Sequence, residues 1–343
     1  MLYWEITRAC DLACLHCRAE AIRQRHPHEL NTDRAMAFLR QILDFGPPLP
    51  HLVITGGDPQ KRPDLFTVVS EATRLGLRVS LAPSATEALT GEAIARLQRA
   101  GVVGMSLSLD GSAAGPHDRL RGVPGCFDRT LLAARDARML GIPLQINTLV
   151  TAETRPDLPA LFRLVETLGV TRWSLFFLIA VGRGRALPGL TPADAEDLCH
   201  WLYERSREAP FTIAVTEAPF YRRVAVQRMR RAGMTEQAIV ESAVGKGFGV
   251  RDGNGILFVS HVGQVYPSGF LPVSAGDVRT ASVVELYREA PLFAALRDVT
   301  GFAGKCGRCS FNAICGGSRA RAFAHTGDAL ASDPLCAYQP DAA

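Results

Sequence analysis

The sequence predicts an α/β fold, in which a partial (β/α)6 TIM-like barrel is followed by a small C-terminal domain. Three observations lead to this prediction. Six short apolar segments alternate with amphipathic stretches up to residue 209, polar motifs directly follow several of those segments, and the alternation stops after residue 210. Strands that alternate with helices form a parallel sheet with right-handed crossovers. Eight such units would close a full barrel, so six predict an incomplete one.

The strands are expected where short runs are continuously apolar, as in parallel sheets covered on both faces. These runs are residues 2–6, 51–55, 77–82, 103–109, 144–150 and 172–178. Helices are expected between them from apolar residues at helical spacing and from closing glycines. These helices are residues 33–44, 64–75, 91–100, 126–140, 158–168 and 191–207. Thr32 and Thr191 are the expected N-caps of the first and the last of them.

The chain is expected to divide into a barrel over residues 1–209, a connection over 210–255 and a C-terminal domain over 256–343. The connection holds a candidate strand at 212–215 and a basic helix at 222–232. Its arginines are expected on a solvated helix surface; they are Arg222, Arg223, Arg228, Arg230 and Arg231. A hairpin is predicted in "ILFVSHVGQVYPSG", with its turn at Gly263-Gln264.

Bulk composition excludes several classes of protein. The net charge of +4 is too mild to indicate nucleic acid as a partner. No hydrophobic run approaches the roughly 20 residues that span a bilayer, and the N-terminus lacks a secretory pattern. A cytoplasmic location is therefore expected, where thiols stay reduced. The nine cysteines are then interpreted as metal ligands or catalysts before disulfides.

Three thiols lie within eight residues in "CDLACLHC", at Cys10, Cys14 and Cys17. Four thiolates would complete a zinc tetrahedron or fully ligate a [4Fe–4S] cube, whereas three leave one iron of the cube open. Structural zinc is the alternative, but it lacks a convincing fourth ligand because His16 lies inside the short loop. The spacing therefore favours a cluster with one reactive iron.

A second set of thiols begins at "CGRCSFNAIC", with Cys306, Cys309 and Cys315, and continues to Cys336. Four thiolates fit either a closed zinc site or a fully ligated iron–sulfur cluster. From Cys306 onward the sequence is rich in glycine and cysteine and poor in periodicity, which is typical of a segment ordered by metal. The remaining cysteines, Cys126 and Cys199, are interpreted as small buried hydrophobic residues.

The stretch "WEITRACDLACLHCRAEA" resembles the signature of radical S-adenosylmethionine (radical SAM) enzymes, Cys-x3-Cys-x-aromatic-Cys, with His16 at the aromatic position. The resemblance implies that Cys10, Cys14 and Cys17 hold a [4Fe–4S] cluster whose open iron chelates SAM. An electron then cleaves the sulfonium and releases a 5′-deoxyadenosyl radical, which abstracts hydrogen from the substrate. It also implies a flavodoxin or ferredoxin as electron donor.

Other motifs match the SAM site of the same family. "TGGDP" resembles its Gly-Gly-Glu-Pro element, which implies that Gly56, Gly57, Asp58 and Pro59 meet the SAM amino group, with backbone that a Cβ would crowd. Further SAM contacts are implied at strand ends for the ribose and carboxylate, namely Ser84, Ser108, Arg121 and Asn147. Structural roles in helix caps or Asx-turns remain open for such polar residues.

The C-terminal thiols resemble the SPASM or twitch extension of radical SAM enzymes. A full SPASM domain has cysteines where this chain has Ser268 and Ser318, so two auxiliary clusters lack ligands. The resemblance implies one auxiliary [4Fe–4S] cluster, held by Cys306, Cys309, Cys315 and Cys336.

Motifs such as "PSGFLPV" and "CGGSRARAFAHTGD" resemble the subgroup that contains the alternative haem and haem d1 pathway enzymes. Hydrogen abstraction by the 5′-deoxyadenosyl radical is the first expectation, and decarboxylation of a tetrapyrrole propionate is the second. Modification of a peptide through a thioether or carbon–carbon crosslink is the alternative, followed by a nucleoside or sugar substrate. A non-catalytic protein with two metal sites, for electron transfer or folding, is the alternative from another class.

Overall fold

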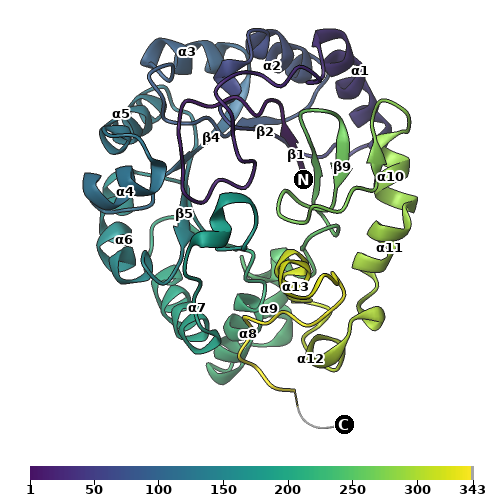
Figure 1. The fold of residues 1–343 in the computed structure, drawn as a ribbon. Helices are drawn as coiled ribbons and strands as arrows, with labels where there is room; N and C mark the ends of the chain where they lie inside the picture. The colour runs from purple at the N-terminus through teal and green to yellow at the C-terminus, as the bar shows by residue number, and fades with distance from the viewer. Residues whose placement is uncertain (341–343) are drawn as a thin grey trace.

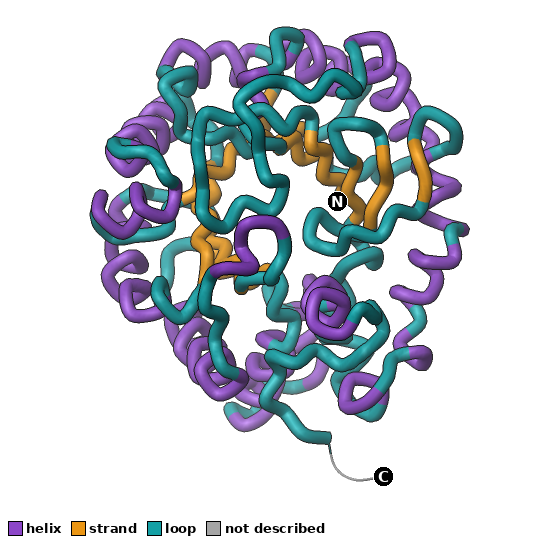
Figure 2. The backbone as a smooth tube through the Cα atoms, in the orientation of Figure 1, coloured by secondary structure: helices purple, strands orange, loops and turns teal. Residues whose placement is uncertain are grey.

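The computed structural model describes residues 1–340 and contains one ten-stranded sheet, which curves inside a ring of helices (Figures 1 and 2). The strand order is β10-β9-β8-β1-β2-β3-β4-β5-β6-β7. Strands β1 to β7 are parallel, β8 is parallel to β1, and β9 and β10 are antiparallel additions. The bounds are β1 Leu2–Glu5, β2 Leu52–Thr55, β3 Val79–Leu81, β4 Val102–Ser108, β5 Leu144–Val150, β6 Arg172–Phe177, β7 Thr212–Thr216, β8 Leu257–Val259, β9 Gln264–Tyr266 and β10 Gly276–Asp277.

The helices α1 to α8 follow the barrel strands around the ring, and α10 and α11 complete it on the far side of β1 (Figure 1). No helix in residues 1–340 has the length and apolar composition needed to cross a membrane. The bounds are α1 Thr32–Ile42, α2 Leu65–Arg74, α3 Gly91–Arg99, α4 Ala114–Arg121, α5 Cys126–Met139, α6 Leu158–Thr167, α7 Pro192–Ser206, α8 Tyr221–Arg231, α9 Glu236–Glu241, α10 Val283–Glu289, α11 Pro291–Arg297, α12 Gly304–Gly307 and α13 Arg319–Thr326. Two short 3-10 helices, η2 (Pro59–Lys61) and η4 (Gly182–Ala186), lie near the barrel mouth.

The core lies between the sheet and the helices, and the inner face of the sheet is polar. In β4, Met105 and Leu107 are buried in the core, whereas Ser106 and Ser108 alternate with them and line a pocket. In β1, Trp4 is fully buried and packs edge-on against Phe38 of α1, with ring centroids 5.1 Å apart. This alternation places polar side chains inside the barrel, where a ligand can reach them.

The predicted parallel α/β sheet is confirmed, and all six predicted strands are present with ends within about two residues. The sheet extends further at both edges. The candidate strand at 212–215 is β7 and pairs with β6, while β8 from the predicted C-terminal domain pairs in parallel with β1. The domain boundaries at 209 and 255 stay a prediction, and the sheet crosses both of them.

Two local expectations were wrong by one residue or more. Asn31, not Thr32, caps α1, because its side-chain oxygen accepts a hydrogen bond from the Arg34 N–H at 3.0 Å. The hairpin turn occupies residues 260–263, and Gln264 already belongs to β9, because the Ser260 N–H donates to the Gln264 carbonyl at 2.9 Å. The expected cap at Thr191 is confirmed, since its hydroxyl accepts from the Asp194 N–H at 3.1 Å.

The expectation that the arginines of the basic helix are solvated was wrong for part of α8. Arg223 is 3% exposed and pairs with Glu196 of α7, and its guanidinium lies 4.9 Å from the ring centroid of Tyr338. Arg230 and Arg231 are both exposed, as predicted. The helix is thus fixed between α7 and the C-terminal segment by inward-facing arginines.

The segment after Cys306 was expected to lack periodic structure, but part of it is helical. α13 spans eight residues there, begins at a Ser318 cap that accepts from the Arg321 N–H, and ends at Gly327 in the left-handed region. Its apolar residues are three alanines and Phe323, so hydrophobic spacing did not reveal it. Cys126 and Cys199 are 1% and 0% exposed, which confirms their interpretation as buried residues.

Candidate functional site

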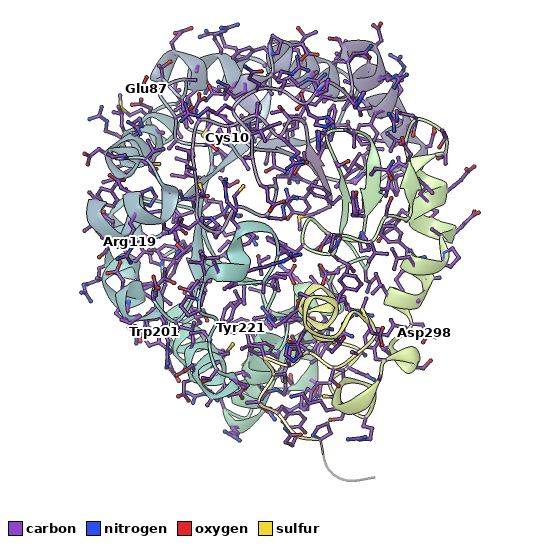
Figure 3. All side chains as sticks on the ribbon, viewed as in Figure 1. Cys10, Glu87, Arg119, Trp201, Tyr221 and Asp298 are labelled. Carbon is purple, nitrogen blue, oxygen red and sulfur yellow. The ribbon has the colours of Figure 1, made fainter. Side chains whose placement is uncertain are left out.

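The loop after β1 carries the three N-terminal thiols and lies at the carboxyl edge of the barrel strands. Cys10 lies inside the ring of helices (Figure 3), and Cys10 and Cys14 are buried in one apolar cluster against which Cys17 packs. The loop is fixed from two sides. The Ala13 N–H donates to the Arg121 carbonyl at the end of α4 at 3.1 Å, and the Cys10 N–H donates to the Ile22 carbonyl at 2.8 Å.

Each of these thiols receives a hydrogen bond from the chain. The Leu12 N–H donates to Cys10 Sγ at 3.4 Å, the Ala21 N–H donates to Cys17 Sγ at 3.3 Å, and Arg121 Nη1 donates to Cys14 Sγ at 3.8 Å. Burial raises the pKa of Cys10 to about 11 and also raises the pKa of Cys14. Buried thiols of this kind ionise when a metal replaces the proton. The donors and the burial therefore fit an iron–sulfur cluster in this loop.

A pocket of about 580 Å³ opens beside the three-thiol loop. It brings together six of the residues predicted to contact SAM, namely Gly56, Gly57, Ser84, Ser108, Arg121 and Asn147. Sequence reasoning missed the other lining residues, which are Leu12, Thr55, Ala82, Pro83, Ala85, Ser106, Cys126 and Thr130. Several of them, such as Ser106, belong to the same strand ends, and the inward alternation of each strand was the signal that could have found them.

The two glycines of "TGGDP" are required by packing within the chain, and their expected approach to SAM stays a prediction. A Cβ on Gly56 would lie 2.5 Å from the Thr7 carbonyl oxygen, and a Cβ on Gly57 would lie 2.5 Å from that of Ala9. The Gly57 N–H also donates to the Thr7 carbonyl at 2.8 Å. The glycines thus let the loop after β2 pack directly on the backbone that leads to Cys10.

Asp58 and Pro59 do not line this pocket. Asp58 is fully buried, and its carboxylate accepts from the Thr86 hydroxyl at 2.8 Å and from the Gln60 N–H at 3.1 Å, as the cap of η2. Burial raises its pKa above the ordinary value. Pro59 is the first residue of η2. Both residues shape the turn, and a contact of Asp58 with SAM stays a prediction.

Arg121 places a fixed positive charge at the pocket wall. Its Nη2 donates to Asp110, whose other oxygen accepts from the Leu149 N–H at 2.7 Å. Burial opposes both charges, yet each partner stabilises the other. The pKa of Asp110 is lowered by Arg121, and that of Arg121 is raised by Asp110. Such a pair holds a guanidinium in place, ready for an anionic ligand.

Ser84 and Asn147 are also held by hydrogen bonds. Ser84 Oγ donates to the Gly57 carbonyl at 2.8 Å and lies 3.5 Å from Cys10 Sγ. Asn147 Oδ1 accepts from Gln145 Nε2 at 2.7 Å. His16 lies outside the pocket lining, with its Nδ1 buried and unpartnered, and burial together with the charge of Arg121 lowers its pKa to about 4.

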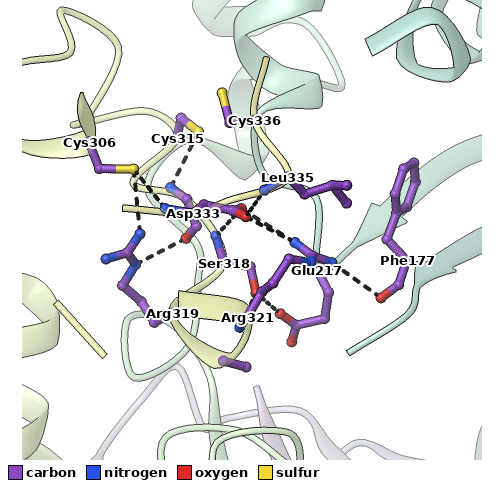
Figure 4. A network of polar contacts seen from close by, with 12 residues as sticks. Phe177, Glu217, Cys306, Cys315, Ser318, Arg319, Arg321, Asp333, Leu335 and Cys336 are labelled. Atoms are coloured by element: carbon purple, nitrogen blue, oxygen red, sulfur yellow. Dashed lines mark hydrogen bonds and ion pairs between the residues drawn. The ribbon is translucent and has the colours of Figure 1, made fainter. Parts of the chain in front are cut away.

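The four C-terminal thiols line a second pocket, of about 370 Å³, on the opposite side of the ring. Cys306 comes from α12, Cys315 precedes α13, and Cys336 lies on the loop beyond α13 (Figure 4). Cys309 lies on the loop between α12 and Cys315. The other lining residues are Arg223, Lys305, Phe311, Asn312, Gly316, Gly317, Tyr338 and Pro340. Within residues 1–340 no group of three or more Cys, His, Asp or Glu side chains is arranged to hold a single metal ion.

These thiols also receive N–H donors. The N–H groups of Phe311, Gly317 and Asp333 donate to Cys309, Cys315 and Cys306, each at 3.4 Å. Arg319 Nη2 donates to Cys306 Sγ at 3.6 Å. Burial raises the pKa of Cys315 to about 12. The donor set is the kind that stabilises thiolate-bound clusters.

A polar network joins this second pocket to the barrel (Figure 4). Arg321 lies 3.3 Å from the carboxylate of Asp333 and donates through Nη2 to the Leu178 carbonyl beyond β6 at 3.3 Å. Ser318 Oγ donates to Glu217, which follows β7 with φ +61. Burial and the nearby Asp252 raise the pKa of Glu217 well above its ordinary value.

The chain is similar to known proteins over nearly its whole length. The profile of the Radical SAM superfamily matches residues 4–165. An AdoMet-dependent heme synthase of Methanosarcina barkeri is 38% identical over 99% of this chain and 97% of its own. Another, of Oleidesulfovibrio alaskensis, is 38% identical over 99% of this chain and 87% of its own. A PqqA peptide cyclase of Rhodopseudomonas palustris is 30% identical over 98% of this chain and 86% of its own.

Solved structures support the same fold. Streptococcus suis SuiB bound to S-adenosylmethionine superposes with a TM-score of 0.74 at 18% identity, over 98% of this chain and 77% of that chain. Native anSMEcpe with bound AdoMet gives a TM-score of 0.71 at 16% identity, over 98% of this chain and 93% of that chain. The resemblance stated from the motifs is confirmed. The chain therefore belongs to the radical SAM superfamily, whose enzymes use S-adenosylmethionine and a [4Fe–4S] cluster.

Proposed function

We propose that this enzyme decarboxylates propionate side chains of an iron tetrapyrrole, as an AdoMet-dependent haem synthase. One observation carries the proposal, the ordering of its relatives. Identity is 38% to two AdoMet-dependent heme synthases, but 28% to an Fe-coproporphyrin III synthase and to a pre-heme d1 synthase. Sequence identity to three PqqA peptide cyclases is 27–30%. All these matches cover at least 98% of this chain, so the ordering compares nearly the same residues of it each time.

The reaction has a simple balance. A propionate becomes a vinyl group when it loses carbon dioxide, one hydrogen atom and one electron. The bound cofactors supply the 5′-deoxyadenosyl radical that takes the hydrogen atom. The broken carbon–carbon bond releases carbon dioxide, and the electron left over needs a one-electron acceptor. Iron coproporphyrin III carries four propionates, of which two become vinyl groups in haem.

The chain supplies binding and orientation. Cys10, Cys14 and Cys17 are the proposed ligands of the SAM-binding cluster, and their N–H donors fit bound thiolates. Arg121 is the proposed partner of the methionyl carboxylate, because Asp110 holds it at the pocket wall. The other proposed SAM contacts lie in the same pocket, namely Gly56, Gly57, Ser84, Ser108 and Asn147.

An auxiliary [4Fe–4S] cluster is part of the proposal. Cys306, Cys309, Cys315 and Cys336 line one pocket with Arg223 and Lys305 beside them, a charge balance that suits an anionic cluster. Such a cluster would provide the one-electron acceptor. A flavodoxin or ferredoxin in the cytoplasm is the proposed donor for the first cluster.

The test is anaerobic incubation of reconstituted enzyme with SAM, dithionite and iron coproporphyrin III, followed by mass spectrometry. Products that have lost one and then two units of carbon dioxide plus two hydrogens support the proposal. The Cys14→Ala variant is the control for non-enzymatic loss. Release of 5′-deoxyadenosine with no change in the tetrapyrrole would contradict it. Crosslinking of a precursor peptide under the same conditions would favour the peptide-modifying alternative.

A further inference from the structure

One edge of the Arg183 guanidinium, formed by Nε and Nη2, is buried and has no hydrogen-bond acceptor. Both nitrogens are inaccessible to solvent, and Arg183 takes part in no ion pair among residues 1–340. A buried donor without an acceptor costs free energy, and a buried charge without a counter-ion costs more. Within the described part of the chain, the other arginines with a buried unpartnered nitrogen leave only Nε empty; these are Arg8, Arg121, Arg205 and Arg223.

Other arginines in this protein bind carboxylates through the same edge, formed by Nε and Nη2. Arg62 donates from Nε and Nη2 to the two oxygens of Asp64, at 2.7 and 2.9 Å. Arg74 binds Glu71 in the same way, at 2.7 and 2.8 Å. This side-on geometry presents two parallel N–H groups to a planar anion. Arg183 has the same pair of donors and no carboxylate.

The backbone of Arg183 is fixed against the three-thiol loop. It lies in η4, which follows β6 and sits over the middle of the ring beside the N-terminal loop (Figure 1). The Arg183 N–H donates to the Cys17 carbonyl at 3.2 Å. Gly182 has φ +52, and a Cβ there would lie 2.6 Å from the same carbonyl oxygen. Only glycine permits this close approach, so η4 is held on the loop rather than free above it.

Arg183 lies outside the lining of the 580 Å³ pocket that gathers the expected SAM contacts. That pocket already has its own guanidinium in Arg121, which is paired with Asp110. A second, unpaired guanidinium beside the cluster loop but outside the pocket fits a different ligand that enters the barrel mouth. His16, on the same loop, presents a second buried and unpartnered polar atom, Nδ1.

We propose that Arg183 binds a carboxylate of the substrate side-on and so positions the substrate beside the SAM site. This inference rests on the proposed function, under which the ligand is a propionate of an iron tetrapyrrole. The shared chemistry is a carboxylate, and SAM has one as well, so the test separates the two sources. Arg183 is a positioning residue, since it supplies no atom to the reaction.

The test uses the anaerobically reconstituted full chain with the variants Arg183→Gln and Arg183→Lys. Gln removes the charge, whereas Lys keeps it and loses the paired N–H groups. The matched control is Arg185→Gln, an exposed arginine two residues further along η4. Absorbance titration measures affinity for iron coproporphyrin III and for its tetramethyl ester. A separate titration measures affinity for SAM, and iron content checks that each variant is loaded.

We expect Arg183→Gln to weaken binding of iron coproporphyrin III roughly 30-fold or more, because it removes a hydrogen-bonded partner of a buried charge. Arg183→Lys is expected to lose about tenfold. Affinity for SAM, affinity for the tetramethyl ester, and the Arg185→Gln control are expected to stay within about twofold of wild type. This pattern assigns a substrate carboxylate to Arg183.

Two results would overturn the inference while leaving the proposed function intact. If SAM binding falls and tetrapyrrole binding does not, Arg183 holds the methionyl carboxylate instead. If neither affinity changes while the wild type decarboxylates iron coproporphyrin III, Arg183 binds no carboxylate. If the wild type neither binds nor converts the tetrapyrrole, the proposed function fails and the inference falls with it.

Discussion

The two thiol pockets share the same local chemistry. In each, buried cysteines accept backbone N–H bonds, and one arginine donates to a sulfur. Arg121 donates to Cys14 in the first pocket, and Arg319 donates to Cys306 in the second. In each, burial raises the pKa of cysteines above the ordinary value. Without metal, the raised pKa values keep these cysteines protonated, so the N–H donors fit thiolates that form when a metal displaces the proton.

The pockets differ in what lies beside the thiols. The three-thiol loop contributes Leu12 to the lining of a pocket of about 580 Å³, whose wall also carries Ser84, Ser108, Arg121 and Asn147. Four thiols line a pocket of about 370 Å³ of their own. Three ligands with an adjoining polar pocket leave a metal position for a second molecule, whereas four ligands close it. Under the proposed ligand sets, the number of thiols and the neighbouring polar surface distinguish a SAM-binding cluster from a closed one.

The pockets also differ in how they are supported. The three-thiol loop rests on the ends of β1 and β2, where the glycines of "TGGDP" pack on its backbone. The four-thiol pocket is built from the short helix α12, loops and the start of α13, joined by Arg321 and Asp333. Elements with little regular pairing depend more on their metal for order. The second pocket is therefore expected to lose structure first when metal is removed.

The largest effect is expected from Cys14→Ala. Loss of one of three ligands removes the first cluster, so release of 5′-deoxyadenosine falls by roughly a thousandfold or more. Iron analysis should still find the second cluster loaded. Cys199→Ala is the matched control, because Cys199 is fully buried, lines neither pocket and is no expected ligand. Wild-type activity in Cys14→Ala would break the distinction between the pockets.

The next effect is expected from Cys315→Ala. We expect about half of the iron to be lost, together with tetrapyrrole turnover, while SAM is still cleaved at the first cluster. The segment from α12 onward should become sensitive to proteolysis, because the metal no longer links its loops. The same control, Cys199→Ala, should retain all the iron. Equal loss of SAM cleavage in Cys315→Ala would show that the two pockets are not separable.

A smaller effect is expected from Asp110→Asn, which leaves Arg121 buried without a counter-charge. Breaking one partner of a buried pair costs about 3 kcal/mol of stability, and SAM affinity should fall because Arg121 is no longer held. Thermal melting and SAM titration measure the two effects. Glu71→Gln is the control, because it breaks a pair with the exposed Arg74. If Asp110→Asn leaves both the melting temperature and the SAM affinity unchanged, Asp110 does not hold Arg121 in place.

The smallest effect is expected from Glu217→Gln. The raised pKa of Glu217 means that the folded protein retains a proton that the unfolded chain has lost. Stability therefore falls as pH rises from the unfolded pKa, near 4.3, toward the raised folded pKa. Gln can still accept from Ser318 and carries no charge. We expect its melting temperature to match or exceed that of wild type, with the advantage growing from about pH 6 to about pH 8. If the melting temperature of Glu217→Gln instead falls further below that of wild type toward about pH 8, Glu217 is ionised and its charge is required.

The sequence was most informative where the chain alternates regularly. Strands β1 to β6 were predicted because each is short and apolar between amphipathic helices. The parallel pairing of β8 with β1 was not, because Leu2 and Leu257 are 255 residues apart and nothing local encodes their register. α4 was missed because it contains Gly115 and Pro116 and few apolar residues. Packing, not propensity, forms that helix.

The candidate site, like the fold, could be predicted from the sequence most readily where the residues lie at the ends of regular strands. Ser108 and Asn147 were predicted from their places at strand ends, and both line the pocket. The side-chain direction of Asp58 was not predictable, since it depends on Thr86 from another loop. Arg183 was missed, although a signal was present. It lies between two glycines just beyond β6, where a barrel of this kind gathers its functional residues.

The most direct test of the two-pocket account is electron paramagnetic resonance of dithionite-reduced enzyme titrated with SAM. If each pocket holds its proposed cluster, two cluster signals are expected, of which one shifts when SAM is added and the other does not. The shifting signal should be missing in Cys14→Ala, and the constant one should be missing in Cys315→Ala. The proposed assignment of one SAM-binding cluster and one closed cluster fails if SAM leaves both signals unchanged, or if SAM shifts the signal that Cys315→Ala removes.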